Sequence, residues 1–264
     1  MQRNETRMIA HETRLWQPVE DRFGWVAGLS LVDNRTELDR SLQQSMLRSA
    51  QTGVLNTVAE GTVYAEGSYR LRDSLTATVG ARYSLVRLGG SAENVPLALA
   101  IERSAVTASR NQSAFLPSAS LMAQLAPETS LYFRYQEGFR PGGLAIEGEF
   151  VRRFERDDAR TIEVGMRHGR PGRDPLDLAV NLSYTKWNDI QADFIDLGGL
   201  PSTANIGDGR VWTISASAGA YLAPDLRLSG GVSINHSTID EPPYDLLLLQ
   251  GRTSHVPNLS LIHI

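Results

Sequence analysis

Arginines at alternating positions of polar-apolar segments are the residues of this chain best suited to binding chemistry. Arg82 and Arg134 lie in segments where polar residues occupy every second position, and Arg140 lies where such a segment meets a long loop. A guanidinium group stays charged and can donate several hydrogen bonds to one anionic partner. Cations that line a confined surface also attract anions by focusing the electric field. We therefore predict that these three arginines contribute to the capture of an anionic solute.

Histidine is the other residue type here that could hold a metal or take part in catalysis. The histidines show no His-x-x-x-His spacing, and the chain has no cysteine. A Gly-x-Ser-x-Gly motif, which would position a nucleophilic serine, does not occur either. The sequence therefore predicts no metal site, no cofactor and no enzymatic activity. The five histidines are His11, His168, His236, His255 and His263.

Three further segments could be interpreted as ligand sites. Residues 138–143 are glycine-rich, but they lack the lysine of a phosphate-binding loop, so a strand that turns into an outer loop is the favoured interpretation. Asp189 and Asp208 could bind an ion, although hydrogen bonds that fix a solvated loop are the favoured role. A charge run could bind an anionic chelate or form an ordinary mixed-charge loop. This run consists of Arg152, Arg153, Glu155, Arg156, Asp157, Asp158 and Arg160.

Short polar turns recur at nearly even intervals and indicate the elements that position these residues. The turns lie at 18–22, 73–74, 127–128, 171–174 and 224–225. Long segments rich in Ser, Gly, Asn and charge lie midway between them, at 37–57, 89–111, 140–160, 193–205 and 236–253. Short turns at one end and long loops at the other are typical of outer-membrane barrels.

The segments between turns and loops alternate apolar and polar residues. In 75–85 the odd positions are apolar and the even positions are small, polar or charged. The segments 62–71, 212–222 and 226–234 alternate in the same way, with the apolar residues at odd positions in the first and at even positions in the other two. Period two is the side-chain period of a strand, and the longer runs reach the roughly 9–11 residues that a tilted strand needs to cross a bilayer. Two groups of aromatic residues on the apolar parity suit two membrane interfaces. These are Tyr69 and Phe133 near the turns, and Tyr83, Tyr184 and Trp212 farther away.

We therefore predict an all-β chain that forms an antiparallel, up-and-down, transmembrane β-barrel wall. A soluble β-sandwich adhesin would show the same alternation, but with its apolar parity buried between two sheets. The mean hydropathy of −0.24 does not separate the two, because a barrel turns every second residue toward water. The net charge of −4 provides no basic surface for nucleic acid, so we expect no nucleic-acid partner.

Five short motifs, in order along the chain, resemble those of TonB-dependent outer-membrane receptors. The longest, at 132–143, reads YFRYQEGFRPGG and is similar to the family's YxxYxxGFRPGG segment. The sequences WNDIQ at 187–191 and NIGD at 205–208 are similar to W-x-D-I-Q and N-x-G-D. Earlier, ETRL at 12–15 and GARY at 80–83 are similar to E-L-R-L and G-x-R-Y.

The resemblance implies a 22-stranded barrel that is closed by an N-terminal plug and lies in the outer membrane of a Gram-negative bacterium. Such receptors import scarce solutes, typically ferric siderophores, with energy from an inner-membrane TonB complex. The implied partners are outer-membrane lipid, the TonB complex and a metal chelate or other small solute. A passive porin or structural barrel is the alternative function.

Residues 1–264 are then expected to be a fragment of the barrel domain, without the plug, the early strands and the final strands. The fragment should supply about 10–11 of the 22 strands and form an open curved sheet in isolation. Its edges would be adhesive because their backbone groups are unpaired. Residues 258–264 are expected to stop in mid-strand, without the turn and terminal aromatic residue that would finish a barrel, and the sequence does not tell whether 259–264 are native.

Overall fold

The computed structural model describes residues 2–45, 48–93, 110–147, 150–195 and 201–240. Within these ranges the chain forms strands and no helix, and ten of the strands make one antiparallel sheet in the order β1-β2-β3-β4-β5-β6-β9-β10-β13-β14. No described helix is long and apolar enough to span a membrane.

The strands of the large sheet are β1 (Gln2–Glu20), β2 (Phe23–Ser45), β3 (Arg48–Arg72), β4 (Leu75–Glu93), β5 (Arg110–Ala126), β6 (Thr129–Arg140), β9 (Asp157–His168), β10 (Leu176–Asn188), β13 (Gly209–Ala223) and β14 (Leu226–Ile239). Two small hairpins complete the fold, β7 (Gly143–Glu147) with β8 (Phe150–Phe154), and β11 (Gln191–Ile195) with β12 (Pro201–Asn205).

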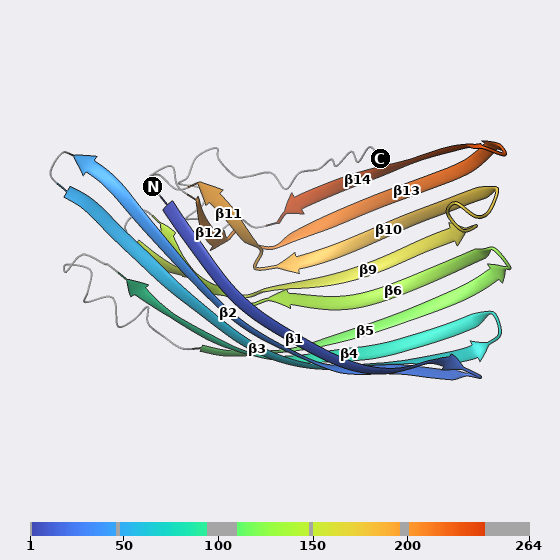
Figure 1. Ribbon diagram of the computed structural model, residues 1–264, viewed down its shortest axis with the longest axis horizontal. Coiled ribbons are helices and arrows are strands. Elements are labelled where there is room, and N and C mark those ends of the chain that lie inside the picture. Colours follow the sequence, from blue (N-terminus) through green and yellow to red (C-terminus); the bar gives the residue numbers. More distant parts are fainter. Residues whose placement is uncertain (1, 46–47, 94–109, 148–149, 196–200, 241–264) are drawn as a thin grey trace.

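Each predicted turn joins two neighbouring strands of the sheet, and the five turns lie together at one end of a curved trough (Figure 1). The strands β1 and β14 are the two edges and do not pair with each other over the described residues. The predicted fold class is therefore confirmed: an up-and-down antiparallel wall that is not closed. We call the end opposite the short turns the rim; the hairpin β11–β12 lies there (Figure 1).

Strand pairing extends farther toward the rim than the sequence predicted. The prediction of a loop at 37–57 is wrong for most of that range, because β2 continues to Ser45 and β3 begins at Arg48. Gln43 lies opposite Ser49 in the pairing of these two strands. The expected loops at 140–160 and 193–205 contain the two small hairpins. Backbone hydrogen bonds between strands do not depend on the polarity of the side chains, so strand pairing can continue where the apolar-polar alternation stops.

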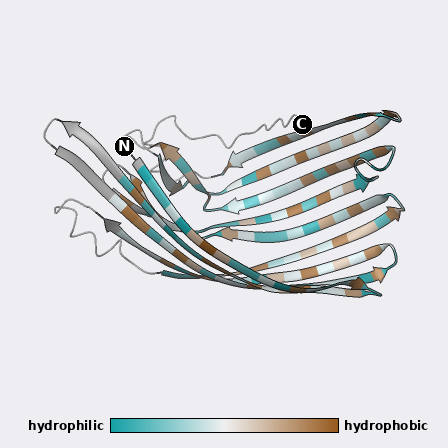
Figure 2. Cartoon of the chain, in the orientation of Figure 1, coloured by the Kyte–Doolittle hydropathy of each residue, from teal (hydrophilic) through white to brown (hydrophobic). Residues whose placement is uncertain are grey.

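One face of the sheet, which we call the apolar face, carries a continuous row of apolar side chains. In Figure 2 the hydrophobic residues appear as brown bands along successive strands. Residues opposite each other in antiparallel strands point to the same face, so the register defines the row. In order across nine strands it comprises Phe23, Tyr69, Ala77, Leu121, Phe133, Val164, Leu182, Ile214 and Ile234. Its large members are between 41% and 52% exposed.

Residues of β3 and β4 on the opposite, polar face are more deeply buried than their apolar-face neighbours. Thr62 and Ser84 are 5% and 0% exposed and share a hydrogen bond of 2.7 Å, whereas the neighbouring Val63 and Leu85 are 53% and 56% exposed. A soluble sandwich would bury the apolar parity and expose the polar one. The β-sandwich alternative is therefore wrong for this sheet, because burial runs in the opposite sense.

The buried apolar core is small and lies on the polar face near the rim. Val54, Val86 and Leu88 are at most 6% exposed there, although their strand positions belong to the polar parity. The hairpin β7–β8 packs against β3 and β4, and its Ile146 is 1% exposed. The Asn56 side chain donates to the Leu144 carbonyl at 2.8 Å and accepts from the Leu144 amide at 2.9 Å. This hairpin therefore folds back onto the inner wall.

Candidate functional site

Two predicted site residues line one groove on the polar face. The groove has a volume of about 420 Å³, and its walls include Tyr64, Glu66, Arg82, Arg134 and Gln136; we call it the inner-wall groove. Arg82 lies on β4 and Arg134 on β6, and both side chains are exposed. Neither forms a salt bridge with a carboxylate in the described part of the chain. Both cations are thus available to an anion that enters the groove.

A tyrosine packed on a glycine supports Arg82. The Tyr64 ring lies over Gly28 on the neighbouring strand, where an added Cβ would come within 2.4 Å of the ring. The Arg82 guanidinium is 6.0 Å from the ring centroid, and the Tyr64 hydroxyl donates to Glu12 Oε1 at 2.6 Å. The ring is held flat against the wall because only glycine leaves room for it.

The same arrangement recurs beside Arg134. The Tyr132 ring lies over Gly165, and its hydroxyl donates to Glu163 Oε1 at 2.7 Å and accepts from Asn181 at 2.9 Å. Arg167 lies 5.8 Å from the ring centroid. Two ordered tyrosine-glycine pairs therefore shape the inner wall, and no short-range sequence signal pointed to them, since each pair joins different strands.

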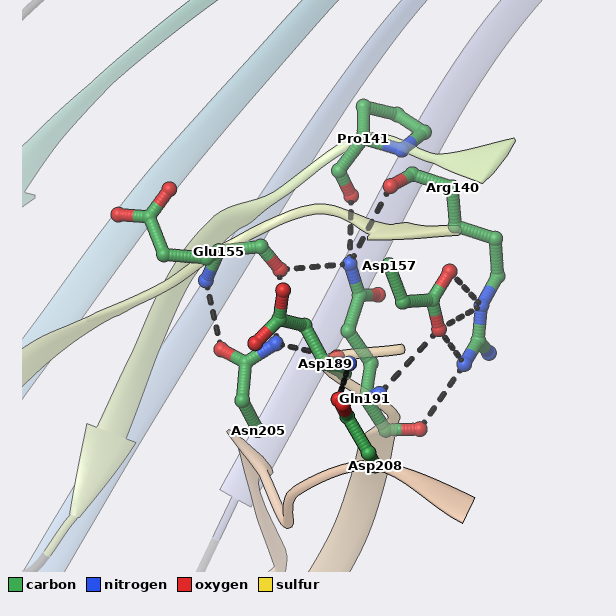
Figure 3. Close-up of polar contacts among 8 residues, drawn as sticks. All are labelled: Arg140, Pro141, Glu155, Asp157, Asp189, Gln191, Asn205 and Asp208. Carbon is green, nitrogen blue, oxygen red and sulfur yellow. Dashed lines mark hydrogen bonds and ion pairs between the residues drawn. The ribbon is translucent and has the colours of Figure 1, made fainter. Parts of the chain in front are cut away.

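Arg140, the third predicted site residue, is placed differently. It ends β6 at the rim, where its Nε donates to Asp157 Oδ2 at 2.9 Å and its Nη2 also contacts that oxygen (Figure 3). Asp157 is 2% exposed, and its Oδ2 also accepts a hydrogen bond from the backbone N–H of Gln191 at 3.2 Å. The guanidinium packs 5.1 Å from the Trp187 ring centroid. Arg140 is thus neutralised by a buried carboxylate, and its direct contact with a solute stays a prediction.

Eight residues from several strand ends converge around this ion pair, and we call them the rim cluster (Figure 3). Gln191 Nε2 donates to the carbonyls of Pro141 at 3.0 Å and Glu155 at 2.9 Å. Asn205 donates to the Glu155 carbonyl at 3.0 Å and accepts from the Glu155 amide at 2.7 Å. The cluster therefore ties the two small hairpins to the wall. Its members are Arg140, Pro141, Glu155, Asp157, Asp189, Gln191, Asn205 and Asp208.

Asp189 and Asp208 fix a loop by hydrogen bonding. The Asp189 amide donates to Asp208 Oδ1 at 2.9 Å, and Asp189 adopts a positive φ of 52°. Aspartate tolerates this left-handed conformation better than most residues. Partial burial, followed by the negative charges of Asp208 and Asp158, raises the pKa of the Asp189 carboxyl.

The charge run at 152–160 is largely paired within the protein. In addition to the pair of Asp157 with Arg140, Glu155 pairs with Arg110 at 2.6 Å, and Arg156 pairs with Asp158 at 3.2 Å. The described structure therefore agrees with the mixed-charge interpretation for most of the run. Arg153 is exposed and borders a second pocket of about 310 Å³ at the rim, with Asn56 and Gly142 on its other walls.

The histidines do not gather into a metal site over the described residues. His11, His168 and His236 lie on the separate strands β1, β9 and β14. No group of three or more His, Asp or Glu side chains is arranged to hold a metal ion in the described ranges. His255, His263 and residues 259–264 lie outside those ranges.

Three of the motifs noted in the sequence meet in the rim cluster. Arg140 and Pro141 come from the segment 132–143, Asp189 and Gln191 from 187–191, and Asn205 and Asp208 from 205–208. The family model for the TonB-dependent receptor-like β-barrel matches residues 10–260. The chain belongs to this family. The resemblance drawn from the motifs is therefore confirmed.

Solved receptors share the fold of this chain at low sequence identity. The ferric yersiniabactin uptake receptor FyuA from Yersinia pestis is similar with a TM-score of 0.68 and 17% identity, over 90% of this chain and 36% of that one. The copper transporter OprC gives 0.65 and 14%, over 90% and 39%. The alcaligin receptor FauA from Bordetella pertussis gives 0.58 and 16%, over 92% and 41%.

The chain thus spans between 36% and 41% of the length of these three structures. None of the curated proteins compared with the chain matches it.

Proposed function

We propose that this chain is part of the wall of an outer-membrane receptor that imports an anionic metal chelate, a ferric siderophore in the first instance, with energy supplied by a TonB complex. The observation that carries the proposal is the two-sided sheet of a TonB-dependent receptor barrel, with Arg82 and Arg134 on its inner face and without a carboxylate partner among the described residues. FyuA and FauA, which share the fold, are named for ferric yersiniabactin uptake and for alcaligin.

In this proposal the apolar face contacts lipid and the polar face lines the lumen. Exposed apolar side chains in register across nine strands suit hydrocarbon, where an exposed polar side chain would be costly. The short turns then face the periplasm, and the rim faces the outside, as is usual for such barrels. The partners are outer-membrane lipid, the TonB complex and the chelate.

The arginines have two roles in this proposal. Arg82 and Arg134 attract the anionic chelate as it passes along the inner wall, because a confined, low-dielectric surface strengthens their field. Arg140 is a positioning residue: through Asp157 it holds the hairpins that shape the rim. A siderophore that carries net negative charge should therefore lose affinity when the first two charges are removed.

The test uses cells that depend on the complete receptor containing this segment. Uptake of radiolabelled ferric siderophores of the catecholate, hydroxamate and phenolate classes is measured for the wild type and for Arg82→Gln/Arg134→Gln. We expect the apparent affinity for the best substrate to fall roughly tenfold, about 1.4 kcal/mol. Arg72→Gln/Arg173→Gln, at exposed positions beside the short turns, removes the same charge and should leave uptake unchanged. Equal uptake by both variants would refute the role of the groove.

Energy dependence separates this proposal from a passive porin. A protonophore should abolish accumulation of the chelate if transport is energised. Accumulation that merely follows the external concentration, with or without the protonophore, would support passive diffusion instead.

A further inference from the structure

Three cations lie side by side on the apolar face near the rim. Arg160 on β9 is opposite Lys186 on β10, and Lys186 is opposite Arg210 on β13. Their positions share the parity of the apolar row, because Arg160 precedes Val164 by four residues and Lys186 follows Leu182 by four. We call these three residues the basic row. It points away from the lumen that holds the inner-wall groove.

The basic row begins directly beyond a band of aromatic and aliphatic side chains. Ile162, Tyr184 and Trp212 are opposite one another one strand repeat closer to the short turns, about 7 Å away. The Tyr184 and Trp212 rings are 4.5 Å apart between centroids. Aromatic residues of this kind mark the interface between hydrocarbon and headgroups. The cations therefore lie at headgroup level if the apolar face contacts lipid.

The charges of the basic row are only partly compensated by the protein. Arg160 lies 3.7 Å from Glu137 and Arg210 lies 2.5 Å from Asp240, so the two outer cations each have a carboxylate partner. Lys186 lies between them and makes no ion pair in the described part of the chain. Like charges directly opposite each other in a sheet are unfavourable. An external anion at Lys186 would relieve this repulsion.

The side chains also have room for such an anion. The Arg160 and Arg210 side chains are 57% and 51% exposed, and Lys186 is exposed as well. Arginine presents a planar fork to phosphate oxygens, and lysine offers a mobile point charge with three donors. The polarity of this face then matches that of a single lipid. Its acyl chains would contact Leu182 and Ile214, its glycerol or sugar would contact Tyr184 and Trp212, and its phosphate would lie at the basic row.

We propose that the basic row of Arg160, Lys186 and Arg210 binds the phosphate of a lipid headgroup in the outer leaflet. The inference rests on the proposed function for its membrane setting alone, and concerns a different face and a different ligand. A bound phosphate would bridge three strands, and so would stabilise the wall beneath the rim cluster.

The test places the complete receptor in nanodiscs of phosphatidylcholine doped with bisphosphorylated lipid A or with its dephosphorylated form. Native mass spectrometry counts the retained lipid. We expect the wild type to retain the phosphorylated lipid at least tenfold better than the dephosphorylated one. The variant Arg160→Gln/Lys186→Gln/Arg210→Gln should lose that preference, and Lys186→Gln alone should weaken it about threefold.

The matched control is Arg22→Gln/Arg72→Gln/Arg173→Gln, which removes three exposed charges beside the short turns and should keep the wild-type preference. Folding of every variant is checked by heat-modifiable mobility on gels; Lys186→Gln, a single exposed substitution, keeps the test decisive if the triple variant misfolds. Retention that is equal in the wild type and in Lys186→Gln, or a wild type without preference for phosphate, would overturn the proposal. Uptake of the ferric chelate is scored separately, so a receptor that transports but retains no lipid counts against this inference only.

Discussion

The inner-wall groove and the rim cluster lie on the same face of one sheet, yet they use arginine in opposite ways. In the groove, Arg82 and Arg134 have no carboxylate partner over the described residues and remain exposed. At the rim, Arg140 is paired with Asp157, which is 2% exposed. Arg134 and Arg140 belong to the same motif at 132–143, so the difference shows that membership of a motif does not decide whether an arginine is paired within the protein.

Solvation explains the contrast. A buried carboxylate is costly unless a cation and further donors satisfy it, so Asp157 requires both Arg140 and the Gln191 amide. A guanidinium on an open wall keeps its hydration and needs no protein partner. We therefore expect substitutions at the rim to change stability, and substitutions in the groove to change binding.

The largest expected effect comes from Asp157→Ala. It leaves the Arg140 guanidinium and the backbone N–H of Gln191 without their acceptor. We therefore expect the free energy of unfolding of the receptor to fall by about 3 kcal/mol. Urea unfolding in detergent micelles measures it. The neighbouring Asp158→Ala, which breaks only the partly exposed pair with Arg156, should cost less than about 1 kcal/mol. Equal losses would show that burial does not separate the two carboxylates.

Gln191→Glu should have the next largest effect. The side-chain amide of Gln191 donates to the backbone carbonyls of Pro141 and Glu155. The carboxylate of a glutamate has no hydrogen to donate. We expect a loss of about 2 kcal/mol, with faster hydrogen exchange in the two small hairpins. At Gln17 the side chain accepts from Trp25 Nε1 at 3.1 Å, so Gln17→Glu keeps its hydrogen bond and serves as the control. Slow exchange in the Gln191 variant would contradict the tethering role.

The groove arginines should be nearly neutral for stability. Arg82→Gln/Arg134→Gln is expected to change the free energy of unfolding by no more than about 0.5 kcal/mol while it weakens chelate uptake. Arg140→Gln should show the reverse, with reduced stability. If all three substitutions destabilise the receptor equally, the distinction between the two regions fails.

Asp189→Asn should have the smallest effect, and its sign should depend on pH. Burial and nearby carboxylates raise the pKa of Asp189 in the folded state, so its charge destabilises the fold once the pH exceeds that pKa. Asparagine removes the charge and tolerates the positive φ. Asp189→Asn should therefore raise the thermal midpoint slightly at pH 7.5 and have no effect below about pH 3, where the carboxyl is protonated in both the folded and the unfolded state. A lower midpoint at pH 7.5 would contradict this.

Local sequence determined the turns, the strand parity and the family. The turns at 73–74 and 127–128 depend on residues next to each other, and the alternation in 75–85 depends on which face of one strand meets an apolar environment. Tyr184 and Trp212 were assigned to one belt from parity, and their rings are indeed neighbours. The strand ends near Ser45 and Arg48 were missed because pairing there continues without alternation.

Tertiary structure alone decided which charges are free and which are paired. Asp157 is one acid among several in a charge run, and only the fold brings Arg140 and Gln191 to it from other strand ends. Val86 and Leu88 have polar parity, but the β7–β8 hairpin covers the region and makes it apolar. The reason is that a strand encodes its own two faces, whereas the partner of each side chain belongs to another strand, and the register between strands sets which residues meet.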